Sequence, residues 1–184
     1  MGIKVLQLLR EAAFQVAAAT LAGQYLGAKL PKQATNAVWQ CLAIGGAIMM
    51  TAGLMLFFCG LPIATFFTRQ PSHPTTLQVA ELLGIVAFAM PPLAVVMILA
   101  GGFRGAGDTR WLLFFTTVGF FAIRIPLAIW VCFESTTIPW IDWEIAGLGW
   151  GVVGAWYAML ADLWIRSGMM VARFLHGGWR LVEI

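Results

Sequence analysis

Three ionisable side chains interrupt long apolar stretches of this sequence: Arg124, Asp162 and Arg166. Asp162 and Arg166 are four residues apart, so a helix would place both on one face. An unpaired charge inside a bilayer costs about 2.5–3.5 kcal/mol on insertion scales, so we expect Asp162 to pair with Arg166, Arg124 or both. Such a carboxylate either clamps helices together or responds to a proton or cation.

A second polar stretch, residues 98–111, has the sequence ILAGGFRGAGDTRW and joins two long apolar runs. Its glycines allow backbone angles that would strain other residues. Its acid or the following threonine can cap the next helix by accepting backbone N–H groups. We therefore predict the cytoplasmic hinge of a helical hairpin. The glycines are Gly101, Gly102, Gly105 and Gly107, and the predicted hinge residues are Arg104, Gly105, Gly107, Asp108, Thr109 and Arg110.

The composition shows which solvent surrounds these groups. The chain has 184 residues, of which 61% are hydrophobic and 10% are charged, whereas soluble domains carry about 25% charged residues. The apolar residues form long blocks, which indicates that lipid is the solvent for most side chains. The net charge of +3 is dispersed along the chain, which argues against nucleic-acid binding.

The apolar blocks predict an all-α membrane protein with about five transmembrane helices. Prolines suggest breaks or kinks in two of them: Pro62 is expected to leave residues 63–67 as a short interfacial turn, and Pro91 to kink the third helix. The predicted helices cover residues 5–27, 38–59, 77–102, 111–133 and 148–174.

The distribution of Lys and Arg predicts the orientation. The first and third connections and the C-terminus are basic, whereas residues 134–145 form an expected loop that contains three acids and no Lys or Arg. Short cytoplasmic loops favour Lys and Arg. We therefore expect a multi-pass protein of the inner membrane with a cytoplasmic C-terminus.

Residue types typical of catalysis or metal binding are scarce. Cys41, Cys59 and Cys132 lie in apolar runs without ligand spacing, and His73 and His176 are isolated. No nucleophile is spaced usefully from a base, and no phosphate-cradling loop precedes a lysine. We expect no enzyme activity, no metal site and no cofactor.

Several stretches, taken in order, resemble the multidrug and toxic compound extrusion (MATE) transporters. Residues 17–28, AAATLAGQYLGA, are similar to the family's ATLVGQxLGA segment, and residues 102–110, GFRGAGDTR, resemble its cytoplasmic RGxGDTR turn. Residues 61–68 and 124–128 are similar to the end of its ninth helix and to a pattern in its eleventh. The motif residues in the first stretch are Gly23, Gln24, Gly27 and Ala28.

The resemblance implies one part of a twelve-helix transporter with two six-helix lobes. The chain would supply helices eight to twelve of the C-terminal lobe and would need the missing N-terminal lobe or a partner chain. The implied function is export of organic cations, drugs or metabolites in exchange for Na⁺ or H⁺. Residues 82–102 lack the acid that some members carry in the tenth helix, so we expect ion coupling through the missing lobe. Two alternatives are an inactive transporter remnant and a lipid-linked oligosaccharide flippase of the same superfamily.

Overall fold

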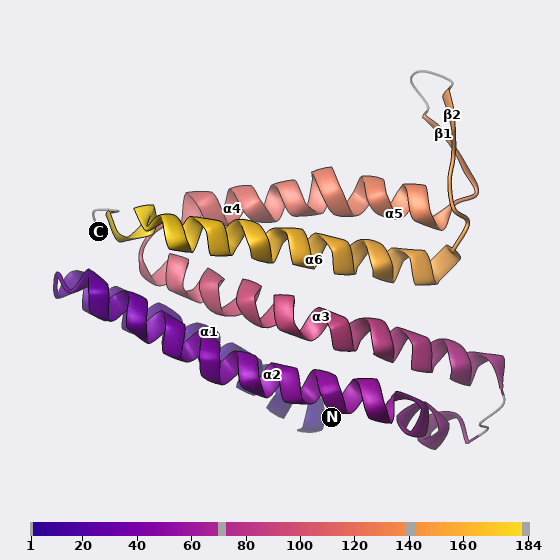
Figure 1. Cartoon of the computed structure of the whole chain (residues 1–184), viewed down its shortest axis with the longest axis horizontal. Helices are drawn as coiled ribbons and strands as arrows, with labels where there is room; N and C mark the ends of the chain where they lie inside the picture. Colours follow the sequence, from indigo (N-terminus) through magenta and orange to yellow (C-terminus); the bar gives the residue numbers. More distant parts are fainter. Residues whose placement is uncertain (1, 70–72, 139–142, 182–184) are drawn as a thin grey trace. The chain divides into compact units, whose positions relative to one another are not determined.

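The chain is helical along most of its length, which confirms the predicted class (Figure 1). The computed structural model describes residues 2–69, 73–138 and 143–181, with side chains from residue 13 to 135 and from 146 to 180 within those ranges. The long helices are α1 (Gly2–Gly27), α2 (Pro31–Thr68), α3 (Pro74–Gly105) and α6 (Gly151–His176). Between α3 and α6 lie α4 (Thr109–Thr117), the π-helix η1 (Val118–Arg124), α5 (Ile125–Cys132), β1 (Ser135–Ile138) and β2 (Trp143–Ala146), and a 3-10 helix, η2 (Gly178–Leu181), follows α6.

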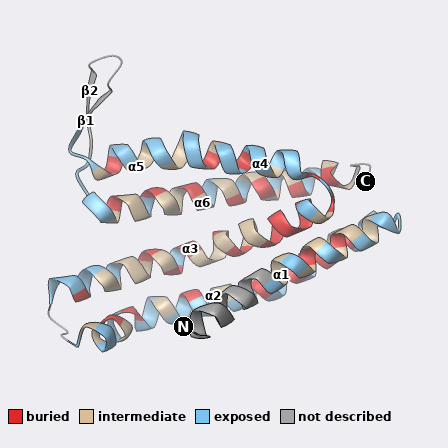
Figure 2. Ribbon diagram, turned by 180° about the vertical axis from the view of Figure 1, so that it is seen from behind, coloured by how far each residue is buried: buried red, intermediate tan, exposed pale blue. Residues whose placement is uncertain are grey.

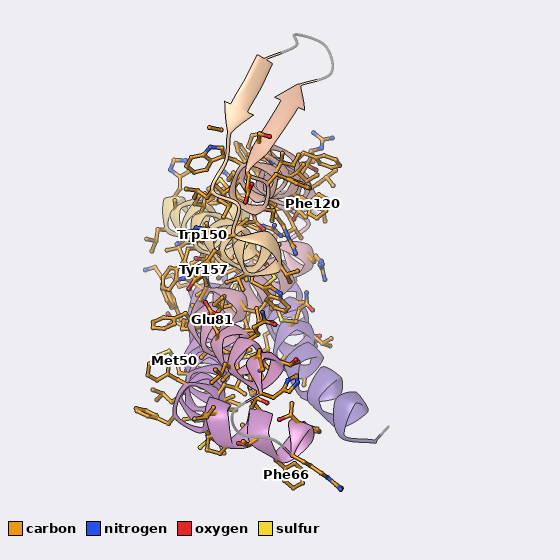
Figure 3. The ribbon with its side chains drawn as sticks, turned by 90° about the vertical axis from the view of Figure 1, so that its right-hand side faces the viewer. Met50, Phe66, Glu81, Phe120, Trp150 and Tyr157 are labelled. Atoms are coloured by element: carbon orange, nitrogen blue, oxygen red, sulfur yellow. The ribbon has the colours of Figure 1, made fainter. Side chains whose placement is uncertain are left out.

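Three helical segments are long and apolar enough to cross a membrane: α2, α3 and the continuous run Thr109–Cys132. Large aromatic side chains are exposed along them, including Phe66 at 78% and Phe67 at 79%, and Figure 3 shows Phe66 pointing away from the ribbon. Water would penalise such a surface, whereas lipid does not. The membrane class is therefore supported, and spans through α1 and α6 remain predictions from the sequence.

The chain divides into two compact units. The first unit comprises Met1–Thr51, Pro91–Thr116 and Arg166–Ile184, and the second comprises Ala52–Met90 and Thr117–Ile165. The first unit contains a continuous buried core to which α1, α2, α3, α4, α6 and η2 contribute (Figure 2). Its fully packed members are Ala22, Ala34, Val38, Leu99, Phe103, Ala106, Phe115, Met170, Phe174 and Trp179.

In the first unit, α1 and α3 approach each other through glycine. A Cβ on Gly101 would lie 2.2 Å from the carbonyl oxygen of Gln15, and one on Gly105 would lie 2.0 Å from that of Ala19. Gly101 and Gly105 form a G-x-x-x-G pair, which lets helix backbones pack closely. The expectation that these glycines supply turn angles was wrong, because α3 continues through Gly105. Their lack of a side chain instead leaves room for the backbone of α1.

The turn after α3 depends on a single left-handed glycine. Gly107 has φ +75°, and its N–H donates to the Arg104 carbonyl at 3.1 Å. The Asp108 N–H donates to the Phe103 carbonyl at 2.9 Å. These two bonds form a Schellman motif, which satisfies carbonyls at the helix end. The predicted hairpin turn is therefore present, but it begins three residues later than expected, because α3 continues to Gly105 and not to residue 102.

The second unit differs from expectation at Pro62. Helix α2 continues through this proline to Thr68, so the predicted interfacial turn at residues 63–67 is wrong. Figure 1 shows the last turns of α2 nearly end-on, at an angle to the turns before them. The proline lacks an N–H and crowds the preceding turn, which bends the helix without ending it. The Thr65 hydroxyl donates to the carbonyls of Leu61 and Pro62 around this bend.

The predicted helix 111–133 contains a π-helical segment. The Ile125 N–H bonds to the Phe120 carbonyl, five residues back. The next residue, Pro126, has no N–H to continue an α-helical ladder, and a wider turn accommodates its ring. The following connection is also more ordered than expected, because β1 and β2 pair antiparallel with Ser135 opposite Ala146. Asp142, one of the three acids of the expected loop at residues 134–145, lies outside the described residues.

The glycine contact between α1 and α3 leads to a direct test. We expect Gly105→Ala to lower the stability of the detergent-solubilised protein by about 1–3 kcal/mol, because the new methyl group overpacks against a backbone carbonyl that cannot rotate away. Gly46→Ala is the matched control, since nothing lies within 4 Å of its Cβ position in α2. Thermal denaturation followed by size-exclusion chromatography measures both variants. Equal melting temperatures for the two variants would contradict the close packing.

Candidate functional site

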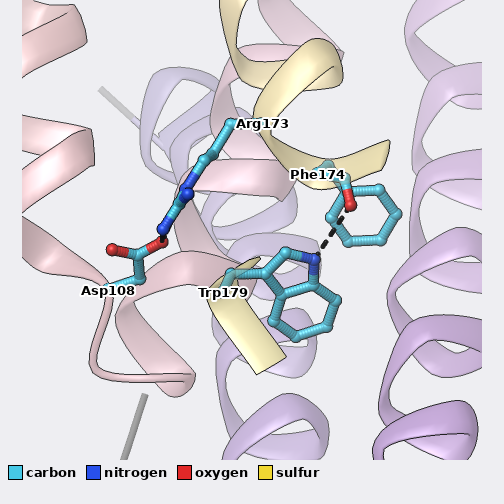
Figure 4. Close-up of polar contacts among 4 residues, drawn as sticks. All are labelled: Asp108, Arg173, Phe174 and Trp179. Atoms are coloured by element: carbon cyan, nitrogen blue, oxygen red, sulfur yellow. Dashed lines mark hydrogen bonds and ion pairs between the residues drawn. The ribbon is translucent and has the colours of Figure 1, made fainter. Parts of the chain in front are cut away.

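The hinge acid is engaged by an arginine 65 residues later in the chain (Figure 4). The Arg173 Nη2 donates to Asp108 Oδ2 at 2.9 Å, and Arg173 Nε donates to the same oxygen at 3.1 Å. The two side chains are 16% and 5% exposed. A charge-assisted pair of this kind is about twice as strong as a neutral hydrogen bond, so it holds the start of α4 against the end of α6.

Both charges also suit the helix ends at which they lie. Asp108 immediately precedes α4, where the positive end of the helix dipole favours an acid. Arg173 lies in the last turn of α6, where the negative end favours a base. The predicted location of Asp108 ahead of the helix is confirmed, whereas its capping hydrogen bond remains a prediction.

Aromatic and glycine contacts fix the position of the Arg173 guanidinium. Its Cζ lies 4.8 Å from the centroid of the Trp111 ring, within the range of a cation–π interaction. Its Nη1 lies 2.7 Å from the position that a Cβ on Gly178 would occupy. A side chain at position 178 would therefore require the Arg173 guanidinium to shift.

The segment after α6 folds back into the core of the first unit. Gly177, with φ +78°, reverses the chain, and Trp179 is fully buried. Its ring stacks on Phe174 at a centroid distance of 5.0 Å, and its Nε1 donates to the Phe174 carbonyl at 3.0 Å. This bond satisfies a carbonyl in the last turn of α6. Figure 4 shows both polar contacts side by side at the end of this helix.

We call this arrangement the C-terminal latch; it consists of Asp108, Trp111, Arg173, Gly178 and Trp179. It joins the α3–α4 turn, α6 and η2 within the first unit. Its groups are a paired acid, a stacked arginine and a buried indole, which provide no free nucleophile or base. The arrangement suits mechanical coupling of helix ends.

The other predicted hinge residues surround the latch without entering it. Arg104 ends α3, and Thr109 and Arg110 begin α4, with all three exposed. Gly105 faces α1, and Gly107 supplies the turn angle.

One residue of the predicted GQYLGA motif packs against α3, and the other three motif residues are exposed. A Cβ on Gly23 would lie 3.0 Å from the Gly105 carbonyl oxygen, so the two family motifs meet at this point. Gln24, Gly27 and Ala28 are exposed, and the Ala28 N–H donates to the Gln24 carbonyl at 3.0 Å. The motif therefore forms the end of α1 and contributes one glycine to the interface with α3.

The charged residues predicted within the membrane lie on α6 and at the end of η1. Asp162 is 1% exposed, one helical turn before the partly buried Arg166. The Arg124 guanidinium lies 5.7 Å from the centroid of the Phe120 ring. The burial of Asp162 agrees with an interior position, and its pairing with either arginine remains a prediction.

Sequence reasoning missed the partner of Asp108. A signal was present, because Asp108 is the single acid between Glu81 and Glu134 and a buried acid requires a cation. Spacing in the sequence could not identify that cation, because several Lys and Arg residues are expected on the cytoplasmic side and nothing in the sequence distinguishes them as partners of Asp108. The described residues contain no group of three or more potential metal ligands.

The ion pair predicts a specific loss of stability. We expect Asp108→Asn to destabilise the protein by about 2 kcal/mol, because it removes a hydrogen-bonded charge while keeping a side chain that can cap α4. Arg110→Gln, two residues away and exposed, should change stability by no more than about 0.5 kcal/mol. Thermal unfolding in neutral detergent measures both, and a cycle with Arg173→Gln isolates the pair. Additive effects in that cycle would show that the ion pair contributes nothing.

Comparison with known proteins agrees with the resemblance of the motifs. The chain is 26% identical over 181 residues to the probable multidrug resistance protein NorM of Thermotoga maritima, covering 97% of this chain and 36% of that protein. It is 28% identical over 155 residues to the multidrug resistance protein NorM of Burkholderia vietnamiensis, covering 83% and 31%. An uncharacterized transporter of Schizosaccharomyces pombe is 27% identical over 176 residues, covering 91% and 29%.

The chain thus spans about a third of the length of these curated relatives. No solved structure matches it significantly. The model of the MatE family matches residues 7–130, more than half of the chain. The chain therefore belongs to the MatE family.

Proposed function

We propose that this chain forms part of a secondary antiporter that exports organic cations, drugs or metabolites in exchange for Na⁺ or H⁺. The observation that carries the proposal is the MatE match over residues 7–130, together with relatives named multidrug resistance proteins. Transport rather than catalysis also suits a latch that joins helix ends and offers no reacting group.

The length of the relatives supports a second element of the proposal. The chain covers 36% and 31% of the two NorM proteins. Alternating access between two lobes needs a second lobe to enclose the substrate. We therefore propose that this chain works with the remainder of a transporter, in the same polypeptide or in a partner chain.

The proposed orientation places the C-terminus in the cytoplasm of a cell with an inner membrane. Positive charge supports it, since the α1–α2 connection, the end of α3, the start of α4 and the end of α6 all carry Lys or Arg. In this orientation the latch lies on the cytoplasmic side. It would hold α3, α4 and α6 together while the lobes move. For transport to be driven, the coupling ion must bind the outward-open state more tightly than the inward-open state.

A chimera tests the transport proposal. The gene segment for this chain replaces the matched third of the Burkholderia vietnamiensis NorM protein in a drug-sensitive strain. We expect lower ethidium accumulation than with an empty vector, with efflux lost when the Na⁺ and H⁺ gradients are collapsed. A correctly inserted chimera without efflux would favour the inactive remnant. Translocation of a lipid-linked oligosaccharide without ethidium efflux would favour the flippase.

Asp162 gives a second test in the same chimera. We expect Asp162→Asn to abolish efflux, because the substitution replaces a buried carboxylate with a neutral amide. A structural clamp predicts that the amount of folded protein falls as well, whereas an ion-responsive carboxylate predicts normal folding without transport. Glu81→Gln is the control, since Glu81 is exposed near the start of α3. Unchanged folding and unchanged efflux in Asp162→Asn would exclude both roles.

A further inference from the structure

Four exposed cations lie at the connections of the first unit: Lys29, Lys32, Arg104 and Arg110. They come from the α1–α2 link, the start of α2, the end of α3 and the start of α4. We propose that these residues, which we call the basic rim, bind the phosphate groups of anionic phospholipids. This proposal concerns the lipid around the chain and does not depend on transport.

Helix contacts within the first unit bring these connections to one end. Gly23 of α1 packs on Gly105, the neighbour of Arg104. Helix α1 ends four residues after Gly23, about 6 Å of helical rise, and Lys29 lies two residues beyond that end. On α2, Val38 contacts Gly102, and Lys32 precedes Val38 by six residues, about 9 Å of helical rise. Figure 1 shows the α1–α2 and α3–α4 turns at the same end of the helices.

The charge balance at this end is strongly positive. The described side chains of the first unit include seven Lys and Arg residues and a single acid, Asp108. That acid is bound to Arg173 in the C-terminal latch. The described part of this unit therefore offers the basic rim no second carboxylate, and the phosphate of an anionic lipid has the charge that suits it.

The backbone of Lys29 has a conformation that lysine rarely adopts. Its φ of +59° is left-handed, and it occupies the position of a Schellman motif where glycine is preferred: its N–H donates to Leu26 and the Leu30 N–H donates to Tyr25. At the equivalent position after α3 the chain has Gly107. A lysine here strains the backbone, and the ammonium group that it provides is exposed. Arg69 in the second unit has the same left-handed conformation, with φ +57°, so the strain alone does not identify a binding residue, and R69Q controls for it.

Tryptophan marks the depth of the rim. Trp111, next to Arg110, is 43% exposed, and Trp39, seven residues after Lys32, is 42% exposed. Partly exposed indoles favour the headgroup level of a bilayer. Lys and Arg at this level lie beside lipid phosphates, and clusters of four or more such cations are typical of anionic-lipid binding. A phospholipid is therefore the partner that fits both the charge and the depth.

Native mass spectrometry of the full chain, released from nanodiscs of equal phosphatidylglycerol and phosphatidylcholine, tests the proposal. We expect phosphatidylglycerol to be retained preferentially, with about a fivefold loss for each cation removed in K29Q, K32Q, R104Q and R110Q. R69Q is the matched control, because Arg69 is exposed in the second unit. Equal loss in R69Q, or no loss in the four rim variants, would overturn the proposal.

Two further measurements separate lipid binding from folding and from free phosphate. K29G should raise the melting temperature in neutral detergent, because it relieves the left-handed strain, while phosphatidylglycerol retention falls. A rise in both quantities would overturn a binding role for Lys29. Inorganic phosphate should not displace the retained lipid, and full displacement by phosphate would identify a site for soluble anions instead.

Discussion

The first unit depends on the close approach of α1 and α3 at Gly101 and Gly105. Helices in lipid gain little from hydrophobic burial against one another, because lipid tails are as apolar as leucine side chains. Their association must come from van der Waals contact, which requires backbones without intervening side chains. The carbonyls of Gln15 and Ala19 occupy the space where side chains would otherwise be. Because Gly105 also ends α3, this contact sets the position at which the following turn begins.

The turn and the latch follow from that position. Gly107 directs the chain into α4 and leaves Asp108 buried at the helix start, where its charge needs compensation. Arg173 supplies it from α6, and Trp111 and Gly178 limit where the guanidinium can lie. The burial of Trp179 then ties the chain after α6 to the same core. The remaining cations of the basic rim, Lys29, Lys32, Arg104 and Arg110, are exposed.

The second unit is built from less regular helices. It contains the bend after Pro62 and the π-helical turn before Pro126. Each irregularity changes the hydrogen-bond ladder of a helix that is long and apolar enough to span a membrane. Such departures from α-helical pairing are tolerated in membranes where neighbouring groups satisfy the backbone, and π-helical turns occur frequently at functional sites. The buried Asp162 belongs to this unit as well.

Composition and motifs alone determined the membrane class, the helical architecture and the family, because long apolar blocks and ordered motifs are properties of the linear chain. They also located most helix ends within a few residues. Only the tertiary structure decided that Gly101 and Gly105 provide contact rather than turn angles, that Arg173 binds Asp108, and that Trp179 is buried. It also showed α2 continuing past Pro62. Local sequence states which residues can turn, pair or pack, but the choice among several equivalent partners depends on which helix ends meet in space.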